Sequence, residues 1–363
     1  MLAPPPLPRT VEASFRDLDA SRPEVRASSI EDLARHALRD PSVRARAIPP
    51  LERALHDNVA GVRSAAAIAL ADLRAKEALQ GLLVAIEDAD AHVRQMALSA
   101  LGEIGDCRAA PRLKRALTDA RPEVRYQAII AYVRVIPEGA DCAAEAEVAL
   151  STAMYDADEA VRYIALRLVE ERVDAAAAQG LTTLLAKIDA MLEASAKQPP
   201  HIVVVAAIVL AKASRQNASV ASTERYRSAR DLLLRVIDGR FRLPTGPARE
   251  DEREAVELAG PLGMTEAIPA LERRAFGLKH LVADTCAYAA TIALARMSHP
   301  RACAELLADL RSSRRATCEA AVVAVGRARL YAAKPIVAGL TAHDADPELI
   351  ARTLEQLADV PAG

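Results

Sequence analysis

The chain has 363 residues, of which 52% are hydrophobic, yet it contains only three Phe, seven Tyr and no Trp. Its 47 basic and 49 acidic residues give a formal net charge of −2, which argues against a whole-molecule attraction to nucleic acid. Alanine, leucine and valine supply most of the apolar content, and they favour closely packed helices over alternating strands.

Residues 1–18 form a Pro-rich segment, which opens with MLAPPPLPRT and lacks the basic and apolar regions of a secretory signal peptide. The longest apolar run, residues 202–211, is only half of the ~20 residues that a membrane-spanning helix needs. The five cysteines are widely spaced and form no CxxC pair, which indicates a reducing compartment. We therefore expect a cytoplasmic protein without a membrane span.

The region from residue 19 to residue 188 contains an internal repeat. The dipeptide Val-Arg recurs at steps of 37, 31, 31 and 37 residues, at Val25-Arg26, Val62-Arg63, Val93-Arg94, Val124-Arg125 and Val161-Arg162. For the last four of these, an alanine follows the valine by four residues and an aspartate precedes it by five. A fixed period near 31 with fixed internal positions indicates a helical solenoid.

Residues 88–105 show what one repeat encodes. Asp88 and Asp90 lie in a turn before a helix, where carboxylates accept free backbone N–H groups and meet the positive end of the helix dipole. Val93 begins an apolar stripe with helical spacing, and Arg94 flanks it. We expect this arginine to reach an acidic turn residue of its own or a neighbouring repeat. Stacked repeats then carry an Asp–Arg ladder, made of Asp57, Arg63, Asp88, Arg94, Asp119, Arg125, Asp156 and Arg162.

A second helix completes each repeat. The phrase AAPRLKRAL at residues 109–117 is echoed by IPPLERAL at 48–55 and by AIPALERRA at 267–275. The alignment extends degenerate repeats over residues 251–363, with a C-terminal capping helix near 346–358. In these repeats the ladder arginine is replaced by Glu252, Ala287, Cys318 and Ile350.

Residues 189–250 depart from the pattern. We expect an irregular helix pair at 200–214 and 223–238, followed by a loop that carries Phe241 between two arginines. Such a loop suits docking of a partner or stacking on a base, but a flexible connector whose Phe packs back on the array is the favoured interpretation. The sequence thus predicts an all-α, right-handed α-solenoid of about nine or ten helix pairs. Its four segments are residues 1–18, 19–188, 189–250 and 251–363.

The repeat resembles the HEAT repeat, and more narrowly its short bacterial subtype named after the phycobilisome lyases. The phrase Asp…Val-Arg…Ala…Ala-Leu…Gly…Gly…Ala…Pro-x-Leu…Leu carries the likeness and is best matched from Asp88 to Asp119. The likeness is clear over residues 57–172 and weaker at 19–56 and 248–358. It is specific for the fold and says little about activity, because such proteins include adaptors, chromophore lyases, a DNA glycosylase group and an iron hydroxylase group.

No motif for a chemical step is present. The hydroxylase group holds iron with His-Glu pairs, and none of the seven histidines here is followed by Glu. The sequence also lacks GxSxG, P-loop, GxGxxG and CxxC signatures. We therefore expect no catalysis, cofactor or metal.

A scaffold that binds another protein along the face of the second helices remains the favoured function. Arginine is enriched at binding hot spots, and several arginines belong to these helices. The candidate partner-binding residues are Arg53, Arg112, Lys114, Arg115, Phe241, Arg273 and Arg274.

Two alternatives stay open. The resemblance allows a chromophore lyase or chaperone, for which Tyr126, Tyr132, Tyr155 and Tyr163 supply either an aromatic cluster or ordinary half-buried helix residues. Residues 301–334 contain seven basic and three acidic side chains, which suits nucleic-acid binding or a solvated helix face. Because acidic residues interrupt any continuous basic groove, we expect nucleic acid not to be the partner.

Overall fold

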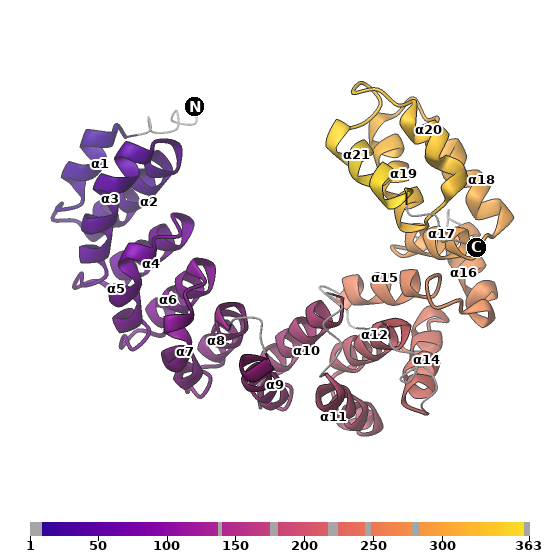
Figure 1. Ribbon diagram of the computed structural model, residues 1–363, viewed down its shortest axis with the longest axis horizontal. Coiled ribbons are helices and arrows are strands. Elements are labelled where there is room, and N and C mark those ends of the chain that lie inside the picture. The colour runs from indigo at the N-terminus through magenta and orange to yellow at the C-terminus, as the bar shows by residue number, and fades with distance from the viewer. Residues whose placement is uncertain are drawn as a thin grey trace, which may run out of the picture. The chain divides into compact units, whose positions relative to one another are not determined.

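The computed structural model describes residues 9–136, 140–174, 181–216, 224–243, 248–277 and 284–358. Within these ranges the regular structure consists of twenty α-helices and five short 3-10 helices (Figure 1). The chain divides into two compact units, residues 1–171 and 172–363. The all-α solenoid predicted from the sequence is confirmed.

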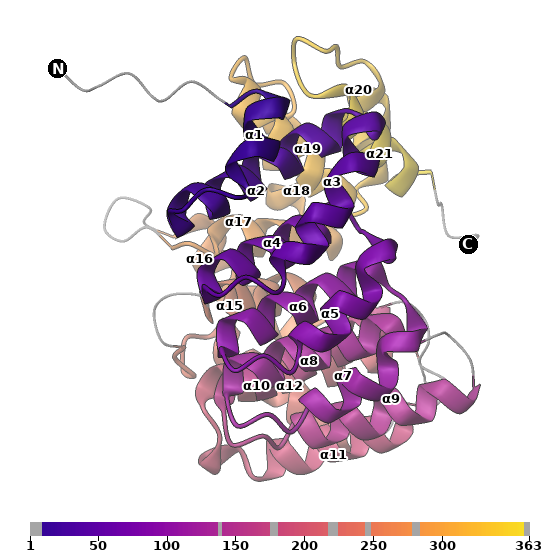
Figure 2. The same cartoon turned by 90° about the vertical axis from the view of Figure 1, so that its left-hand side faces the viewer.

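The first unit stacks its helices in two rows, here called row A and row B (Figure 2). Row A contains α2 (Pro23–Arg39), α4 (Ala60–Asp72), α6 (Ala91–Ile104), α8 (Pro122–Val135) and α10 (Glu159–Asp174). Row B contains α3 (Pro41–Ala54), α5 (Leu79–Ala85), α7 (Ala110–Ala116) and α9 (Ala140–Ala153). The helix α1 (Val11–Asp17) packs on α2, and the 3-10 helices Lys76–Ala78 and Cys107–Ala109 lead into α5 and α7.

The second unit continues the alternation after α11 (Thr182–Glu193). Its row A contains α12 (Pro200–Gln216), α15 (Ala248–Leu258), α17 (Ala287–Arg296), α19 (Arg315–Arg327) and α21 (Pro347–Gln356). Its row B contains α14 (Glu224–Ile237), α16 (Ile268–Phe276), α18 (Pro300–Asp309) and α20 (Lys334–Ala338). The 3-10 helices are Ser195–Lys197, Thr265–Ala267 and Tyr331–Ala333. The predicted helices at 200–214, 223–238 and 346–358 correspond to α12, α14 and α21.

Helix α6 shows how the repeat phrase folds. The carboxylate of Asp90 caps the helix by accepting from the backbone N–H groups of His92 and Val93. The helix ends at Gly105, whose φ of +69° lies in the left-handed region that glycine tolerates. The apolar stripe from Val93 to Ile104 is buried, so one face of the helix forms core.

Small residues let the row A helices approach one another closely. A Cβ atom added at Gly102 of α6 would lie 3.1 Å from the Cα of Ala131 in α8. Ala97 and Ala128, the alanines four residues after the repeat valines, have no solvent exposure. Alanine at these positions therefore serves packing between repeats, and the core lies between rows A and B. None of the described helices is both long and apolar enough to cross a membrane.

Candidate functional site

The ladder arginines of the first unit that reach the next repeat all bind in the same way. Each uses Nε and Nη2 to hold both carboxylate oxygens of an aspartate in that repeat, at 2.7–3.0 Å. The pairs are Arg26 with Asp57, Arg63 with Asp88, Arg94 with Asp119 and Arg125 with Asp156. These side chains are 12–16% exposed, so each pair is largely shielded from water. The ladder links consecutive repeats.

Each ladder arginine also contacts its own turn. The Nη1 of Arg125 donates to the carbonyl oxygen of Asp119 at 2.9 Å, and the corresponding bond of Arg94 goes to Asp88. The aspartates fold their turns as well, because Asp156 accepts from the N–H of Asp158 at 2.8 Å. The hydrogen bonds from Arg125 lower the pKa of the Asp156 carboxyl below its ordinary value of 3.8. One Arg–Asp pair thus provides an ion pair, hydrogen bonds that fold the two turns, and a link between consecutive repeats.

Arg162 ends the series differently. Its Nη1 donates to the carbonyl oxygens of Asp156 and Ala157, as in the earlier repeats. Its Nε is buried and has no hydrogen-bond partner among the described residues. In the second unit Glu252 occupies the ladder position and accepts instead from Arg274 at 2.8 Å. The ladder belongs to the first unit.

Most of the predicted partner-binding residues are paired within the chain. Arg112 and Arg115 of α7 both lie near Glu87, at 3.9 and 3.8 Å. Lys114 contacts Glu145 at 3.3 Å. These pairs lie on the exposed side of α7, where a partner would have to compete with the intramolecular carboxylates.

The candidates in the second unit, Arg273, Arg274 and Phe241, also make contacts within the chain. Arg273 contacts Asp238 at 3.3 Å, and Arg274 is only 13% exposed, with hydrogen bonds to two backbone carbonyls of α14. Phe241 is half-buried, and the guanidinium of Arg235 lies 5.6 Å from its ring centroid. Its loop folds back on α14 through a bond from the Phe241 N–H to the Arg235 carbonyl. The sequence did not reveal the contacts of Arg274, whereas the packing of Phe241 back on the array was one of its two interpretations.

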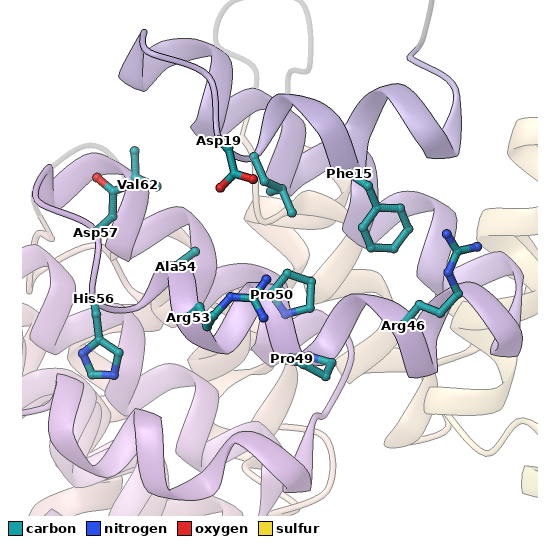
Figure 3. Close-up of a pocket in the computed structure, with 11 residues that line it drawn as sticks. Phe15, Asp19, Arg46, Pro49, Pro50, Arg53, Ala54, His56, Asp57 and Val62 are labelled. Carbon is teal, nitrogen blue, oxygen red and sulfur yellow. The ribbon is translucent and has the colours of Figure 1, made fainter.

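Arg53 is different, because it is exposed and has no ion pair or side-chain hydrogen bond among the described residues. It lines a hollow of about 690 Å³ between α1 and α3, at the start of the first unit (Figure 3). The lining residues are Phe15, Leu18, Asp19, Arg46, Pro49, Pro50, Arg53, Ala54, His56, Asp57 and Val62. In Figure 3 the Arg53 side chain reaches towards Pro50, and the Asp19 carboxylate projects towards the hollow from the opposite wall.

Arg46 is the second exposed cation of the hollow. Its guanidinium carbon lies 4.7 Å from the centroid of the Phe15 ring, and it too has no acidic partner in the described part of the chain. Residues 46, 49, 50 and 53 follow helical spacing on one face of α3. The repeat pattern does not single out Arg46, Phe15 and Asp19, because Phe15 precedes the repeats and the other two do not belong to the recurring phrase. The one available signal was the Pro-Pro pair, which other copies of the second helix lack.

Comparison with known proteins gives a family match for part of the chain. Residues 48–133 match the family described as HEAT repeats, and they run from α3 to α8. No curated protein matches the sequence.

Solved structures extend the likeness of fold along the chain. The karyopherin Kap121p, bound to the extreme C-terminus of the protein phosphatase Cdc14p, aligns with a TM-score of 0.53 and 14% identity. The match covers 96% of this chain and 41% of Kap121p. The complex of CpcE and CpcF of phycocyanin lyase from Nostoc aligns at 14% identity over 98% of both chains, with a TM-score of 0.42. The family match thus places HEAT repeats at residues 48–133, and the likeness to Kap121p shows a shared fold along the chain.

Proposed function

We propose that this protein is a non-enzymatic scaffold or adaptor that binds another protein on the row B side of its first repeats. The observation that supports this most strongly is the hollow between α1 and α3. There Arg46 and Arg53 project from α3 without an acidic partner in the described residues, although arginines on later row B helices are paired. Unpaired arginine beside apolar surface is the kind of group that forms binding hot spots.

Proteins of the same fold provide support of a general kind. Kap121p has been solved in complex with RanGTP and with Ste12p, at TM-scores of 0.52 to this chain. A solenoid can bind proteins without a catalytic centre, because its stacked helices offer a long surface of independent side chains. Fold likeness alone does not identify a function, so the hollow carries the proposal.

The described residues favour a protein partner over the two alternatives. Tyr132 is buried in the core and donates a hydrogen bond to Glu145, so it is not available to a pigment. In the basic region near the C-terminus, Arg315 pairs with Glu319 and Arg327 with Glu257. These pairs reduce the positive charge that could attract phosphates.

Affinity capture tests the proposal. The tagged full-length protein would be used to capture partners from a lysate of its native cells, with and without nuclease. We expect one or two proteins to be recovered in stoichiometric amount under both conditions, and to bind the purified scaffold saturably without a cofactor. Recovery that collapses with nuclease, or a coloured eluate with visible absorbance, would contradict a protein scaffold.

A further inference from the structure

The hollow arises where the first repeat differs from later ones. In the aligned row B helices, Arg53 of α3 corresponds to Arg115 of α7, and Pro50 corresponds to Arg112. In the later repeat, Glu87 lies near both arginines, at 3.9 Å from Arg112 and 3.8 Å from Arg115. In the first repeat the position of Glu87 is taken by Asp19, whose side chain is one methylene shorter.

The shorter side chain of Asp19 does not form an ion pair with either arginine of the hollow. No contact within 4.0 Å joins Asp19 to Arg53 or Arg46 in the described structure, and both arginines remain exposed. Asp57, the other carboxylate in the lining, is already held by Arg26 at 2.8 Å. The hollow therefore presents two cations against one uncompensated anion.

The two prolines of α3 also line the hollow. Proline has no backbone N–H, so Pro49 and Pro50 cannot donate to the carbonyl oxygens of Ala45 and Arg46. The ring of a proline inside a helix lies against the carbonyl four residues earlier. The prolines therefore contribute apolar surface to the hollow, and the two arginines contribute its hydrogen-bond donors.

We propose that the hollow between α1 and α3 binds an acidic segment of the partner protein, through two carboxylates that pair with Arg46 and Arg53. The inference rests on the proposed scaffold function and specifies its site and chemistry. Guanidinium groups bind carboxylates through two parallel hydrogen bonds, as the ladder arginines do in this chain. Pro49, Pro50 and Leu18 offer apolar surface for a side chain between the two acids.

The spacing of the arginines sets the spacing of the acids. Arg46 and Arg53 are seven residues apart on α3, which corresponds to about 10 Å along a helix axis. In an extended peptide, side chains four residues apart lie on the same face about 13 Å apart, a span that the flexible arginine side chains can match. The expected ligand thus carries Asp or Glu at two positions four residues apart, with an apolar residue midway between them on the same face.

Selection from a phage-displayed library of random octapeptides tests this directly. The immobilised baits are the full-length protein, the variant R46E/R53E and the control R121E/R134E, which changes two exposed arginines outside the candidate partner-binding residues. The two variants change the net charge equally, but only the first alters the hollow. We expect the wild-type protein and the control to enrich acidic peptides with the stated spacing, and synthetic versions to bind R46E/R53E at least about tenfold more weakly in fluorescence anisotropy.

Several results would overturn the inference. These are enrichment of peptides without paired acids, no enrichment at all, or equal loss of binding in both double variants. The last would mean that general charge, and not the hollow, attracts the peptide. Self-association of the wild-type protein that R46E/R53E abolishes would identify the occupant as a second copy of this chain. Because Arg46 and Arg53 are exposed, R46E/R53E should fold, and melting curves by circular dichroism verify this for both variants.

The substitution Asp19→Glu provides a test that leaves net charge unchanged. The longer side chain should reach Arg53 as Glu87 reaches Arg115, so we expect the selected peptide to bind about threefold more weakly. Unchanged affinity would contradict the role assigned to Asp19. If a captured partner binds R46E/R53E normally, the inference fails while the scaffold proposal stands. If the peptide binds but no protein is captured, the scaffold proposal fails instead.

Discussion

At the scale of single residues, one arginine per repeat joins its own turn to the next repeat of the first unit. Arg94 contacts its own turn through Nη1 and the aspartate of the next repeat through Nε and Nη2. The sequence could predict which residues take part, because the repeat period places them at fixed positions. It could not decide between a partner in the same repeat and one in the next, because that choice depends on how the repeats stack.

Loss of a ladder arginine should destabilise the first unit. We expect Arg125→Ala to lower the free energy of unfolding by about 2 kcal/mol at pH 7, because it leaves the shielded Asp156 carboxylate without its charged partner. Urea denaturation measures the change. As a control, Arg121→Ala removes an exposed arginine that pairs with Glu123 and should have little effect.

The deficit of Arg125→Ala should depend on pH with a defined sign. Because Arg125 lowers the folded-state pKa of Asp156, its contribution is fully present above the ordinary value of 3.8 and is lost as pH falls through the lowered pKa. The stabilities of wild type and variant should therefore converge below about pH 4. A deficit of constant size from pH 7 to pH 3 would contradict this account of the ladder.

At the scale of helices, caps and close approaches explain why the repeat phrase keeps its glycines and alanines. Gly102 and Gly105 could be predicted as a helix end from their spacing. The structure separates their roles, since Gly102 allows α8 to approach α6 and Gly105 ends α6 with a positive φ. The Arg273–Asp238 pair could not be predicted, because it depends on how α14 and α16 pack. The packing of Phe241 back on the array was one of the two interpretations that the sequence allowed.

Two glycines should respond oppositely to alanine. Gly105→Ala forces a side chain into the left-handed region and should cost about 1 kcal/mol. Gly61 lies in the first turn of α4 with nothing within 4 Å of an added Cβ. Gly61→Ala should therefore stabilise the protein by about 0.5 kcal/mol, because alanine is the better helix former. Thermal melting of both variants measures the two signs, and a loss of stability in Gly61→Ala would refute the argument.

At the scale of the whole molecule, the repeat pattern predicts the architecture well and the site poorly. The pattern describes what the repeats share, whereas the hollow forms where the first repeat departs from it. Arg53 was predicted because it occupies a repeated position. Phe15 was not, since it precedes the repeats, and Asp19 was not, because its position, taken by Glu87 in a later repeat, is not part of the recurring phrase. The division into four segments stays a prediction. The structure divides the chain into two compact units, residues 1–171 and 172–363.

The most direct test of the central claim is a hydrogen–deuterium exchange footprint of the full-length protein with its captured partner. We predict that saturating partner slows exchange in α1 (Val11–Asp17) and in α3 (Pro41–Ala54), while α7 (Ala110–Ala116), whose arginines are already paired, changes little. Protection confined to α7 or to the second unit, with α1 and α3 exchanging as in the free protein, would contradict the claim that the first repeat holds the partner.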